Sequence, residues 1–414
     1  MEKKRVVITG LGVVAPNGIG RDAFWQACLN GKSGIGLIKA FDATLFNSRI
    51  CGQIDNFDPE SFISKEFIRK TDRFVHLGLA ACKLSLEDSK LDLNQEDLKK
   101  IGVIIGSGAG GQLFHEEQMM IAYAKGPDKV SPRCISKITP NAVSSNIAIY
   151  FGFKGPNMVI STACSSGTMA IGEALRYIQN SDMQICVAGG AEAPLTRFCF
   201  GAYDAMSALS RHNDSPQEAS RPFDKERDGF VLSEGASILI LEEFEHAVNR
   251  DAHIYAELIG YSCNCDSYDM VKPLLSGIDA SRVISGALIN AQINPDSVDY
   301  INAHGTSTFF NDVVETLAIK NAFGEHAYKI PVSSIKSMIG HSLGAAGAIE
   351  AAATCLAIET GVIPPTINYQ YPDSECDLDY VPNHARPAKI NSAISNSFGF
   401  GGINSCVVFN KFTG

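Results

Sequence analysis

Short runs of β-branched and other apolar residues recur along the whole chain, and most of them end at glycine or another small residue. Several are apolar throughout, as in Ile101–Ile105 and Ile185–Ala188, and a strand that is apolar on both faces is typical of a sheet covered by helices on both sides. Between the runs lie segments with the apolar spacing of helices, such as Thr71–Ser89 and Ala345–Glu359. The alternation predicts an α/β fold built in layers.

The length indicates two packed units. A chain of 414 residues exceeds the ~250–300 residues at which one hydrophobic core stops growing. A second round of strands and helices begins near residue 253, after the charged stretch Glu242–Asp251, and no long linker separates the two rounds. We therefore predict two tightly docked halves, residues 1–250 and 251–414.

Each half contains a strand, a turn and a helix rich in glycine and alanine. The strand Met158–Ser161 precedes the first such helix near Cys164, and the strand Val332–Ser334 precedes the second near Gly344. Small residues let helix backbones approach closely, so the two helices would suit the centre of a layered molecule. The alternative is that alanine simply favours helix formation.

The composition excludes several classes of protein. The chain has 35 Lys and Arg residues and 45 Asp and Glu residues, so its formal net charge is −10. This charge argues against general nucleic-acid or membrane-surface binding. We expect neither a membrane helix, which needs an apolar run of ~18–20 residues, nor a secretory leader. The twelve cysteines are scattered and lack a zinc-finger spacing, so we expect no metal and a cytoplasmic protein with buried thiols.

Cys164 is the strongest candidate nucleophile. A buried strand ends just before it, in Ser161-Thr162-Ala163-Cys164, and a helix is expected to start at or just after it. A helix N-terminus favours a thiolate over a thiol, so this position predicts a depressed pKa and a reactive sulfur. The alternative is a buried structural cysteine, as we expect for most of the other eleven.

Two histidines lie at similar strand-to-helix turns. His304 follows the strand Val298–Ile301, and His341 lies between a strand and the second small-residue helix, with Lys336 five residues earlier and Glu350 inside the helix. Strand ends are where α/β folds place their sites. Each histidine alone fits an ordinary turn, but one cysteine and two histidines at such turns favour a catalytic group.

A glycine-rich loop completes the candidate site. Gly399, Gly401 and Gly402 surround Phe400 near the C-terminus, and such a backbone can approach a ligand closely and offer N–H groups to an oxyanion. The commoner use of these glycines is a tight hairpin turn.

In this order, the blocks around Cys164, His304, Lys336–His341 and Gly399–Gly402 resemble the β-ketoacyl-acyl-carrier-protein synthases of type II fatty-acid and polyketide pathways. The resemblance covers essentially the whole chain and includes Arg221–Asp224. It implies a duplicated thiolase-like fold in five layers (α-β-α-β-α), with two central sheets and a buried helix pair.

The resemblance also implies roles for individual residues. Cys164 would accept an acyl chain from a carrier-protein thioester, with the N–H groups of Cys164 and Phe400 holding the oxyanion. His304 and His341 would promote decarboxylation of malonyl-carrier, and the resulting enolate would attack the acyl group. Substrates would arrive on the phosphopantetheine of an acyl carrier protein, so no further cofactor is expected. The remaining implied roles are a charged pair formed by Lys336 and Glu350, loop support by Gly399, Gly401 and Gly402, and pantetheine binding by Thr306 and Thr308.

An acidic carrier needs a local basic patch on a chain that is itself negative. Lys65, Arg69, Lys70 and Arg73 lie at roughly one helix face, and the first three fall where the family keeps docking residues. The alternative is an ordinary solvated basic face.

Two details favour the polyketide branch of the family. Asn311 and Asp312 resemble polyketide ketosynthases more than fatty-acid ones, and Ala109 is smaller than the aliphatic residue usual in fatty-acid elongation, which could enlarge the acyl pocket. We expect the catalytic subunit of a type II polyketide synthase, paired with itself or with a homologous chain-length factor. The alternative is a fatty-acid elongating 3-oxoacyl synthase.

Three other readings stay open. Gly106–Gly111 satisfies G-x-G-x-x-G, which suggests a dinucleotide-dependent oxidoreductase, but no acidic residue closes a second strand ~20 residues on. A non-catalytic chain-length factor would lack Cys164. A thiolase would use a second cysteine where this loop has Phe400, although Cys406 lies close by.

Overall fold

The computed structural model, which describes residues 3–413, is built around one large mixed sheet. Its strands run in the order β11-β10-β14-β15-β9-β1-β8-β7-β5-β6, with β2 beside β1. Their bounds are β1 Val6–Ala15, β2 Gly18–Ile19, β5 Ile101–Gly106, β6 Asn157–Ile160, β7 Ile185–Glu192, β8 Gly235–Glu243, β9 Ala256–Cys265, β10 Tyr300–Asn302, β11 Val332–Ser333, β14 Ser392–Gly399 and β15 Ile403–Asn410. The short strands β3 Gly36–Leu37, β4 Ile50–Cys51, β12 Val362–Ile363 and β13 Arg386–Pro387 form two separate hairpin-like pairs.

The sheet consists of two arms with the same internal plan. In the arm β6-β5-β7-β8-β1, the first three strands are parallel and β8 is antiparallel to both of its neighbours. The arm β11-β10-β14-β15-β9 repeats this pattern, with β15 as the antiparallel strand. The arms join where β1 pairs with β9 through Val7–Glu257 and Ile8–Ala256. The two sheets implied by the resemblance are therefore two arms of one hydrogen-bonded sheet.

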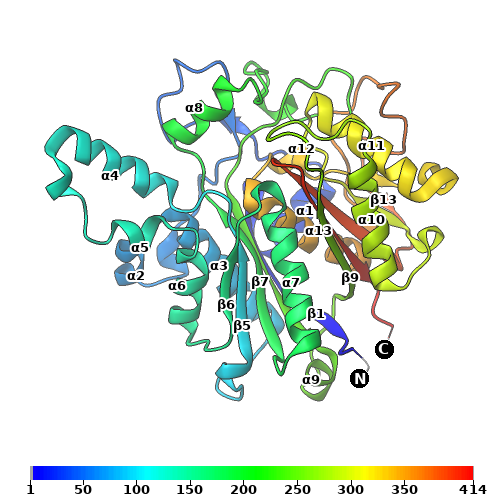
Figure 1. Cartoon of the computed structure of the whole chain (residues 1–414), viewed down its shortest axis with the longest axis horizontal. Helices are drawn as coiled ribbons and strands as arrows, with labels where there is room; N and C mark the ends of the chain where they lie inside the picture. The colour runs from blue at the N-terminus through cyan, green and yellow to red at the C-terminus, as the bar shows by residue number, and fades with distance from the viewer. Residues whose placement is uncertain (1–2, 414) are drawn as a thin grey trace.

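Helices cover both arms and separate them (Figure 1). α3 packs on the outer face of the first arm, α10 and α11 lie outside the second, and α7 and α13 pack together between the arms. The helices are α1 Arg21–Leu29, α2 Lys65–Lys70, α3 Arg73–Ser89, α4 Gln112–Lys125, α5 Cys134–Ile138, α6 Ala142–Phe151, α7 Ser166–Asn180, α8 Arg197–Ala205, α9 Phe244–Asn249, α10 Ile278–Ala291, α11 Phe309–Phe323, α12 Lys336–Ile339 and α13 Ala346–Thr360. The predicted layered α/β fold is confirmed.

The central helix pair depends on glycine at its contact. A Cβ atom on Gly167 of α7 would lie 2.9 Å from the backbone nitrogen of Ala348, and one on Gly347 of α13 would lie 2.0 Å from Oγ1 of Thr168. Both distances are shorter than any real Cβ contact, so larger residues would force the helices apart. The small residues predicted for the two central helices are therefore a packing requirement.

The stretch Leu343–Thr360 resembles a membrane helix in length and composition, although no membrane span is expected from the sequence. Its 18 residues have a mean hydropathy of 1.2, so by length and composition alone it could cross a membrane. However, 89% of it is buried inside the protein, because α13 lies between the two arms. A helix that is apolar on all sides is what this central position requires.

Candidate active site

The nucleophile candidate lies on a sharp turn between a strand and a helix. After β6, a 3₁₀ turn η4 (Ala163–Ser165) leads into α7, and Ala163 has a φ of 52°, which is unusual for a residue with a side chain. The hydroxyl of Ser166 accepts a hydrogen bond from the Thr162 N–H at 2.9 Å and donates one to the Ala163 carbonyl at 2.6 Å. These two hydrogen bonds hold Cys164 at the N-terminal end of the helix.

The two histidines come from loops of the other half. His304 follows β10, and the carboxylate of Glu315 on α11 accepts the N–H groups of His304 and Gly305 at 2.8 Å each. His341 lies after α12, where its N–H donates to the Val231 carbonyl at 2.7 Å. Backbone hydrogen bonds therefore fix both loops, independently of the imidazole rings.

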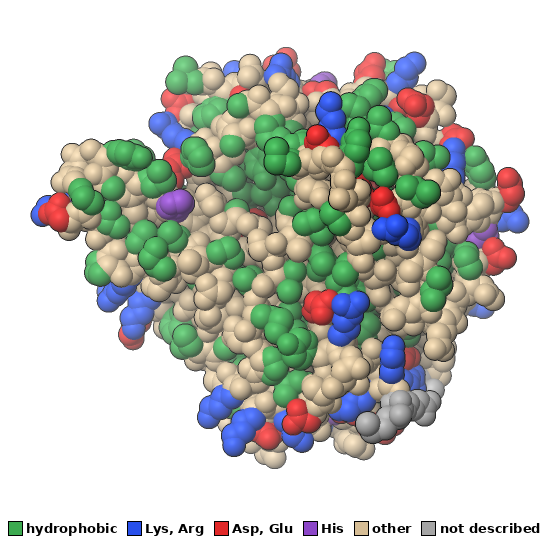
Figure 2. All heavy atoms as spheres, in the orientation of Figure 1, with side chains coloured by type: hydrophobic (Ala, Val, Ile, Leu, Met, Phe, Trp, Pro, Cys, Tyr) green, Lys and Arg blue, Asp and Glu red, His purple; other side chains and the backbone are tan. Residues whose placement is uncertain are grey.

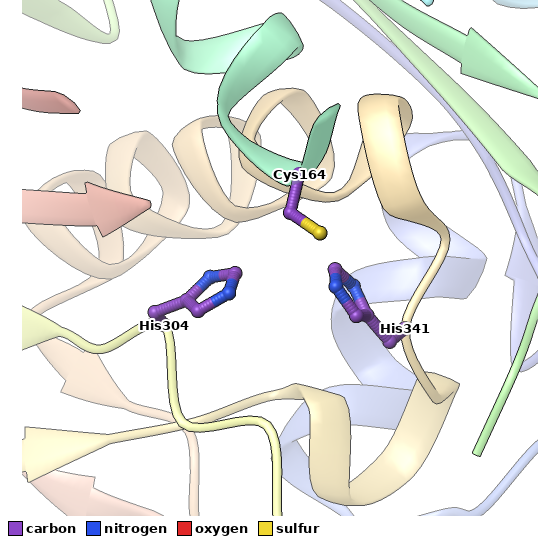
Figure 3. A group of neighbouring side chains, drawn as sticks. All are labelled: Cys164, His304 and His341. Atoms are coloured by element: carbon purple, nitrogen blue, oxygen red, sulfur yellow. The ribbon is translucent and has the colours of Figure 1, made fainter. Parts of the chain in front are cut away.

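Cys164, His304 and His341 meet at one point (Figure 3). One ligating atom from each side chain lies within 4.8 Å of the other two, and all three residues are buried. The two imidazole rings are 5.3 Å apart between centroids and nearly perpendicular, at 85°. The sequence placed these residues at three separate turns, and the structure brings them together.

Lys336 sets the charge and the tautomer of His304. Its buried Nζ donates to the His304 carbonyl at 2.6 Å, lies 3.3 Å from Nδ1 of the same residue and forms an ion pair with Glu350. An ammonium group can only donate, so Nδ1 is an acceptor and the ring proton of His304 is on Nε2. The predicted pairing of Lys336 with Glu350 is present in the structure.

Both imidazoles are neutral at neutral pH. Burial, followed by the charge of Lys336, lowers the pKa of His304 and of His341 well below the ordinary value, and the neighbouring imidazole contributes to the effect on His304. Neutral rings can donate or accept a proton without adding charge to the buried site.

The pKa of Cys164 contradicts the sequence prediction. Burial raises it to about 11, although Lys336 and a hydrogen bond from the Phe400 N–H act to lower it. The helix start was expected to favour the thiolate, but the cost of removing a charge from water is larger. The resting residue is therefore a thiol, and its proton must leave when it reacts.

The glycine-rich loop lies against this thiol. Phe400 is in the turn between β14 and β15, and its N–H contacts the sulfur. Gly401 and Gly402 have φ values of 81° and 68°, which favour glycine. A Cβ on Gly399 would lie 2.9 Å from the Thr162 carbonyl. The loop is a hairpin turn, as the alternative held, and it also approaches the nucleophile.

A cavity of about 360 Å³ opens from the three catalytic candidates. Thr306 and Thr308 line it, and their hydroxyl oxygens are 2.8 Å apart. The wall also contains polar side chains such as Asp228, Lys272 and Asn311, and the aromatic residues Tyr203, Phe230, Phe309, Phe310, Phe398 and Phe400. An apolar channel with two hydroxyls suits a long, weakly polar group.

Ala109 is not among the residues that line this cavity. Its N–H donates to Oε1 of Glu192 at 3.0 Å, and the Gly108 N–H donates to Oε2 of the same residue at 2.7 Å. A role for Ala109 in an acyl pocket stays a prediction. The same bonds occupy the amides that a bound dinucleotide would need.

The proposed docking cations lie on α2, and all three are exposed. Lys65 pairs with Glu60 at 3.1 Å, and Lys70 pairs with Glu66. Arg73 does not belong to this face, which is a correction. It begins α3, and its guanidinium forms an ion pair with the buried Glu234, with Nε 2.6 Å from Oε2.

Two buried carboxylates, Glu192 and Glu315, were missed in the sequence, and the structural role of Asp312 was not predicted. Burial raises the pKa of Glu192 and of Glu315 to about 7, and Asp312 accepts the N–H groups of Thr306 and Phe223. Each of them holds a loop of the site in place. Acidic residues within or beside apolar segments, as in Gly-Gly-Ala-Glu-Ala around Glu192, were the available signal.

Cys164, His304 and His341 also have the donor types of a zinc site. The ammonium group of Lys336, 3.3 Å from His304, places a positive charge next to them and opposes binding of a cation. The arrangement therefore fits acyl chemistry better than metal binding.

Comparison with known proteins agrees with this geometry. The chain matches the family models described as Beta-ketoacyl synthase, N-terminal domain, over residues 3–247 and Beta-ketoacyl synthase, C-terminal domain, over residues 255–370. The chain belongs to the β-ketoacyl synthase family. The resemblance and the ketosynthase class of enzyme predicted from the sequence are thereby confirmed, and an oxidoreductase is excluded.

Relatives from both branches of the β-ketoacyl synthase family cover nearly the whole chain. A 3-oxoacyl-[acyl-carrier-protein] synthase 2 from Synechocystis is 47% identical over 412 residues, which are 100% of this chain and 99% of the relative. A putative polyketide beta-ketoacyl synthase 1 from Streptomyces cyaneus is 41% identical and covers 98% of this chain and 97% of the relative.

Two solved structures of β-ketoacyl synthases show the same fold. A type II polyketide ketosynthase, in complex with its acyl-carrier protein and bound to a hexaketide, has a TM-score of 0.92 and 38% identity, with 100% of both chains covered. The ishigamide ketosynthase/chain length factor has a TM-score of 0.94 and 32% identity, also with 100% of both chains covered.

Proposed function

We propose that this chain joins an acyl group held on Cys164 to a malonyl unit on an acyl carrier protein, with loss of carbon dioxide. The observation that carries the proposal is a buried thiol in contact with an oxyanion-type N–H and close to two neutral imidazoles, at the inner end of an apolar channel. Cys406, the second cysteine that a thiolase would need, is buried within β15 and outside the lining of this channel.

The first step transfers the acyl group. The sulfur of Cys164 attacks the carbonyl carbon of the carrier thioester, its proton leaves for a neutral imidazole, and the carrier thiol departs with a proton. The N–H groups of Cys164 and Phe400 hold the oxyanion that forms on the way. Because the resting thiol has a pKa of about 11, this step needs the neighbouring base.

The second step forms the carbon nucleophile. The bond between the malonyl methylene and its carboxylate breaks, carbon dioxide leaves, and the electron pair delocalises onto the thioester oxygen as an enolate. The Nε2–H of His304 donates to that oxygen, and His341 acts from the other side of the cavity. Neutral donors stabilise the developing charge without protonating the carbon too early.

The third step closes the cycle. The enolate carbon attacks the acyl carbonyl on Cys164, the bond from carbon to sulfur breaks, and the thiolate takes up one proton from solvent to restore the thiol. The product is a 3-oxoacyl chain on the carrier, with Thr306 and Thr308 binding the amide-bearing pantetheine arm along the channel.

Intact-mass spectrometry tests the proposal. The chain is incubated with acyl-carrier, then with malonyl-carrier, and both proteins are weighed after each step. We expect one acyl adduct on Cys164, followed by its loss and the appearance of 3-oxoacyl-carrier. An adduct on a different thiol, or turnover with acyl-coenzyme A and no malonyl-carrier, would contradict it.

For carrier docking, we propose the exposed cations of α2. Replacement of Lys65, Arg69 and Lys70 by glutamate should lower carrier-dependent turnover several-fold at low salt, because surface charge steers association. The matched control makes the same charge change at the exposed residues Lys99, Lys154 and Lys411. Equal turnover rates for the two triple variants would show that α2 is not part of the docking surface.

For the pathway, we propose the polyketide branch. Asn311 supports it, since this residue lines the cavity and donates from Nδ2 to Asp312 at 3.1 Å. The alternative, fatty-acid elongation, is favoured by the 47% identity to the Synechocystis 3-oxoacyl synthase. Purified chain that is active alone and builds only saturated chains would decide for the alternative.

For the partner, we propose a second copy or a homologue of this chain, bound along β6. Within residues 3–413, β6 ends the first arm and pairs only with β5, and an open strand edge can pair with another chain. Figure 2 shows hydrophobic side chains on the projecting α4 nearby, where Met119, Met120 and Tyr123 are exposed. Light scattering that gives the mass of a single chain at micromolar concentration would contradict this.

A further inference from the structure

Glu192 ends β7, and its carboxylate binds backbone groups from both halves of the molecule. The side chain is fully buried, but no Lys, Arg or His of residues 3–413 forms an ion pair with it. Oε2 accepts the N–H groups of Gly108 at 2.7 Å and of Gly344 at 3.2 Å. Oε1 accepts the N–H group of Ala109 at 3.0 Å and the hydroxyl of Ser107 at 3.3 Å. The glycine-rich loop after β5 therefore meets the turn before α13 at this one side chain.

These contacts require the ionised form of Glu192. A backbone N–H group can only donate, and a carboxylate accepts on both oxygens, whereas a protonated carboxyl group has one oxygen that donates. A proton on Oε2 would oppose the N–H groups of Gly108 and Gly344, and a proton on Oε1 would oppose that of Ala109. Burial raises the pKa of Glu192 to about 7, so the form that the two loops require is lost as the pH falls through neutrality.

The titratable groups whose pKa responds to the charge of Glu192 are neutral at neutral pH. They are the thiol of Cys164 on η4 and, on α8, the thiol of Cys199 and the phenol of Tyr203, and burial raises the pKa of all three. The hydrogen bonds to Glu192 lower its pKa against the effect of burial. The charge of this carboxylate is therefore tied to the positions of the loops that bind it.

The ring of His341 depends on its backbone for its orientation. Its buried Nδ1 has no hydrogen-bond partner among the described residues, whereas Nδ1 of His304 lies 3.3 Å from the ammonium group of Lys336. Gly344 follows His341 by three residues, and its N–H is bonded to Glu192 just before α13 begins. A shift of that carboxylate therefore moves the chain that carries the ring.

We propose that Glu192 is a positioning residue for malonyl decarboxylation, because its ionised carboxylate fixes the turn that carries His341 and protonation releases that turn. The inference rests on the proposed function and adds a residue to it. Glu192 does not line the cavity, so it touches no substrate and acts through His341. Acyl transfer uses one imidazole as a base, whereas decarboxylation uses both, and a small displacement of one group slows the step that depends on it.

Glu192→Gln imitates the protonated form, because glutamine has the same size and only one accepting oxygen. Two single-turnover rates are measured by intact mass between about pH 6 and about pH 8.5. They are acylation of Cys164 by acyl-carrier and condensation of the acylated chain with malonyl-carrier. In the unchanged chain, the ratio of condensation to acylation should fall several-fold as the pH falls through about 7.

In Glu192→Gln, the ratio of condensation to acylation should be about tenfold lower than in the unchanged chain at about pH 8. It should also vary less with pH. The variation that remains belongs to Glu315, whose pKa is also about 7.

Ser107→Ala is a second test, which needs no change to Glu192 itself. It removes one of the hydrogen bonds that lower the pKa of Glu192. The fall in the ratio should therefore move to higher pH by about half a pH unit. A pH dependence identical to that of the unchanged chain would overturn the role of the ionised carboxylate.

Glu242→Gln is the matched control, because Glu242 is a fully buried glutamate on β8 whose partners, among them Arg250, lie outside the lining of the cavity. It should lower the melting temperature and keep the ratio of the unchanged chain. Equal losses of both rates in Glu192→Gln would mean that Glu192 only stabilises the fold. That result, or an unchanged ratio, would overturn the inference and leave the proposed function intact. No adduct on Cys164 of the unchanged chain would contradict the proposed function, and the inference with it.

Discussion

The two halves of the molecule build the same turn and use it differently. In the first half, η4 follows β6 and leads into α7. In the second, η8 (Leu343–Ala345) follows α12 and leads into α13. Ala163 and Leu343 occupy the same place in their turns, with φ values of 52° and 48°. Aligned on these residues, Cys164 corresponds to Gly344.

This correspondence shows that the two turns share a backbone conformation but differ in chemical role. Both turns aim the residue after the strained position at the centre of the molecule, but only one of them carries a reactive atom there. Gly344 serves as a close-packing point, since a Cβ on it would lie 2.6 Å from Oε2 of Glu192. Its N–H donates to that same carboxylate at 3.2 Å. One turn presents a nucleophile, and the other supports the loop that carries His341.

The largest expected effect comes from removing the sulfur. Cys164→Ala should abolish acyl uptake, lowering it by at least about 10³-fold, because no other group of either turn can form the thioester. Adduct formation by intact mass is the measurement. Cys265→Ala, which changes an exposed thiol, is the control and should keep full uptake. Acyl uptake that persists in Cys164→Ala would show that another residue is the nucleophile.

Gly344→Ala tests the supporting turn. The added methyl group would meet Oε2 of Glu192 and the backbone nitrogen of Gly108, each at 2.6 Å. We expect a destabilisation of about 1–3 kcal/mol, seen as a lower melting temperature together with slower acylation. Gly36→Ala is the control, since a Cβ there meets nothing within 4 Å. Equal melting temperatures for the two variants would show that the second turn is looser than its distances indicate.

The pH dependence of alkylation tests the charge state of the nucleophile. With a pKa of about 11 for Cys164, the thiolate fraction at neutral pH is small and grows with pH. The rate of reaction with iodoacetamide, read on the peptide that contains Cys164, should rise about tenfold per pH unit from neutral to about pH 10. A rate that levels off below about pH 8 would instead indicate the depressed pKa expected from the helix start alone.

The smallest effect concerns the hydroxyls of the two turns. Ser342 has a buried hydroxyl with no partner among the described residues, so Ser342→Ala should change the free energy of unfolding by less than about 0.5 kcal/mol. Ser166→Ala breaks two hydrogen bonds and should cost about 1–3 kcal/mol. If denaturant unfolding gives the same loss of free energy of unfolding for both variants, the Ser166 hydrogen bonds do not stabilise the first turn.

Much of the site follows from local sequence, because strand ends and small-residue helices leave clear patterns. Cys164, His304 and His341 could be located in this way, since each follows a recognisable run. The charge state of Cys164 could not, because burial depends on residues from both halves. Arg73 was assigned to the wrong helix face because α2 ends at Lys70 and a new helix begins at Arg73. Thr71 and Asp72 cap these two helices, and the spacing of charged residues does not reveal such a break.

Residues that hold loops were the hardest to predict. Glu192 and Glu315 bind backbone amides that are distant in sequence, and an acidic side chain gives no local sign of such partners. The sequence thus predicts which groups react, and the folded chain is needed to learn what positions them.

The position of α13 has a consequence for biosynthesis. Thirteen of its 15 residues are buried. The residues of α7 that pack against it are synthesised long before α13 leaves the ribosome. Until residue 360 has emerged, the nascent chain carries an uncovered apolar surface where the nucleophile will later lie. Such a surface can associate with other chains, so the second half of elongation is the period in which this protein is most exposed to aggregation.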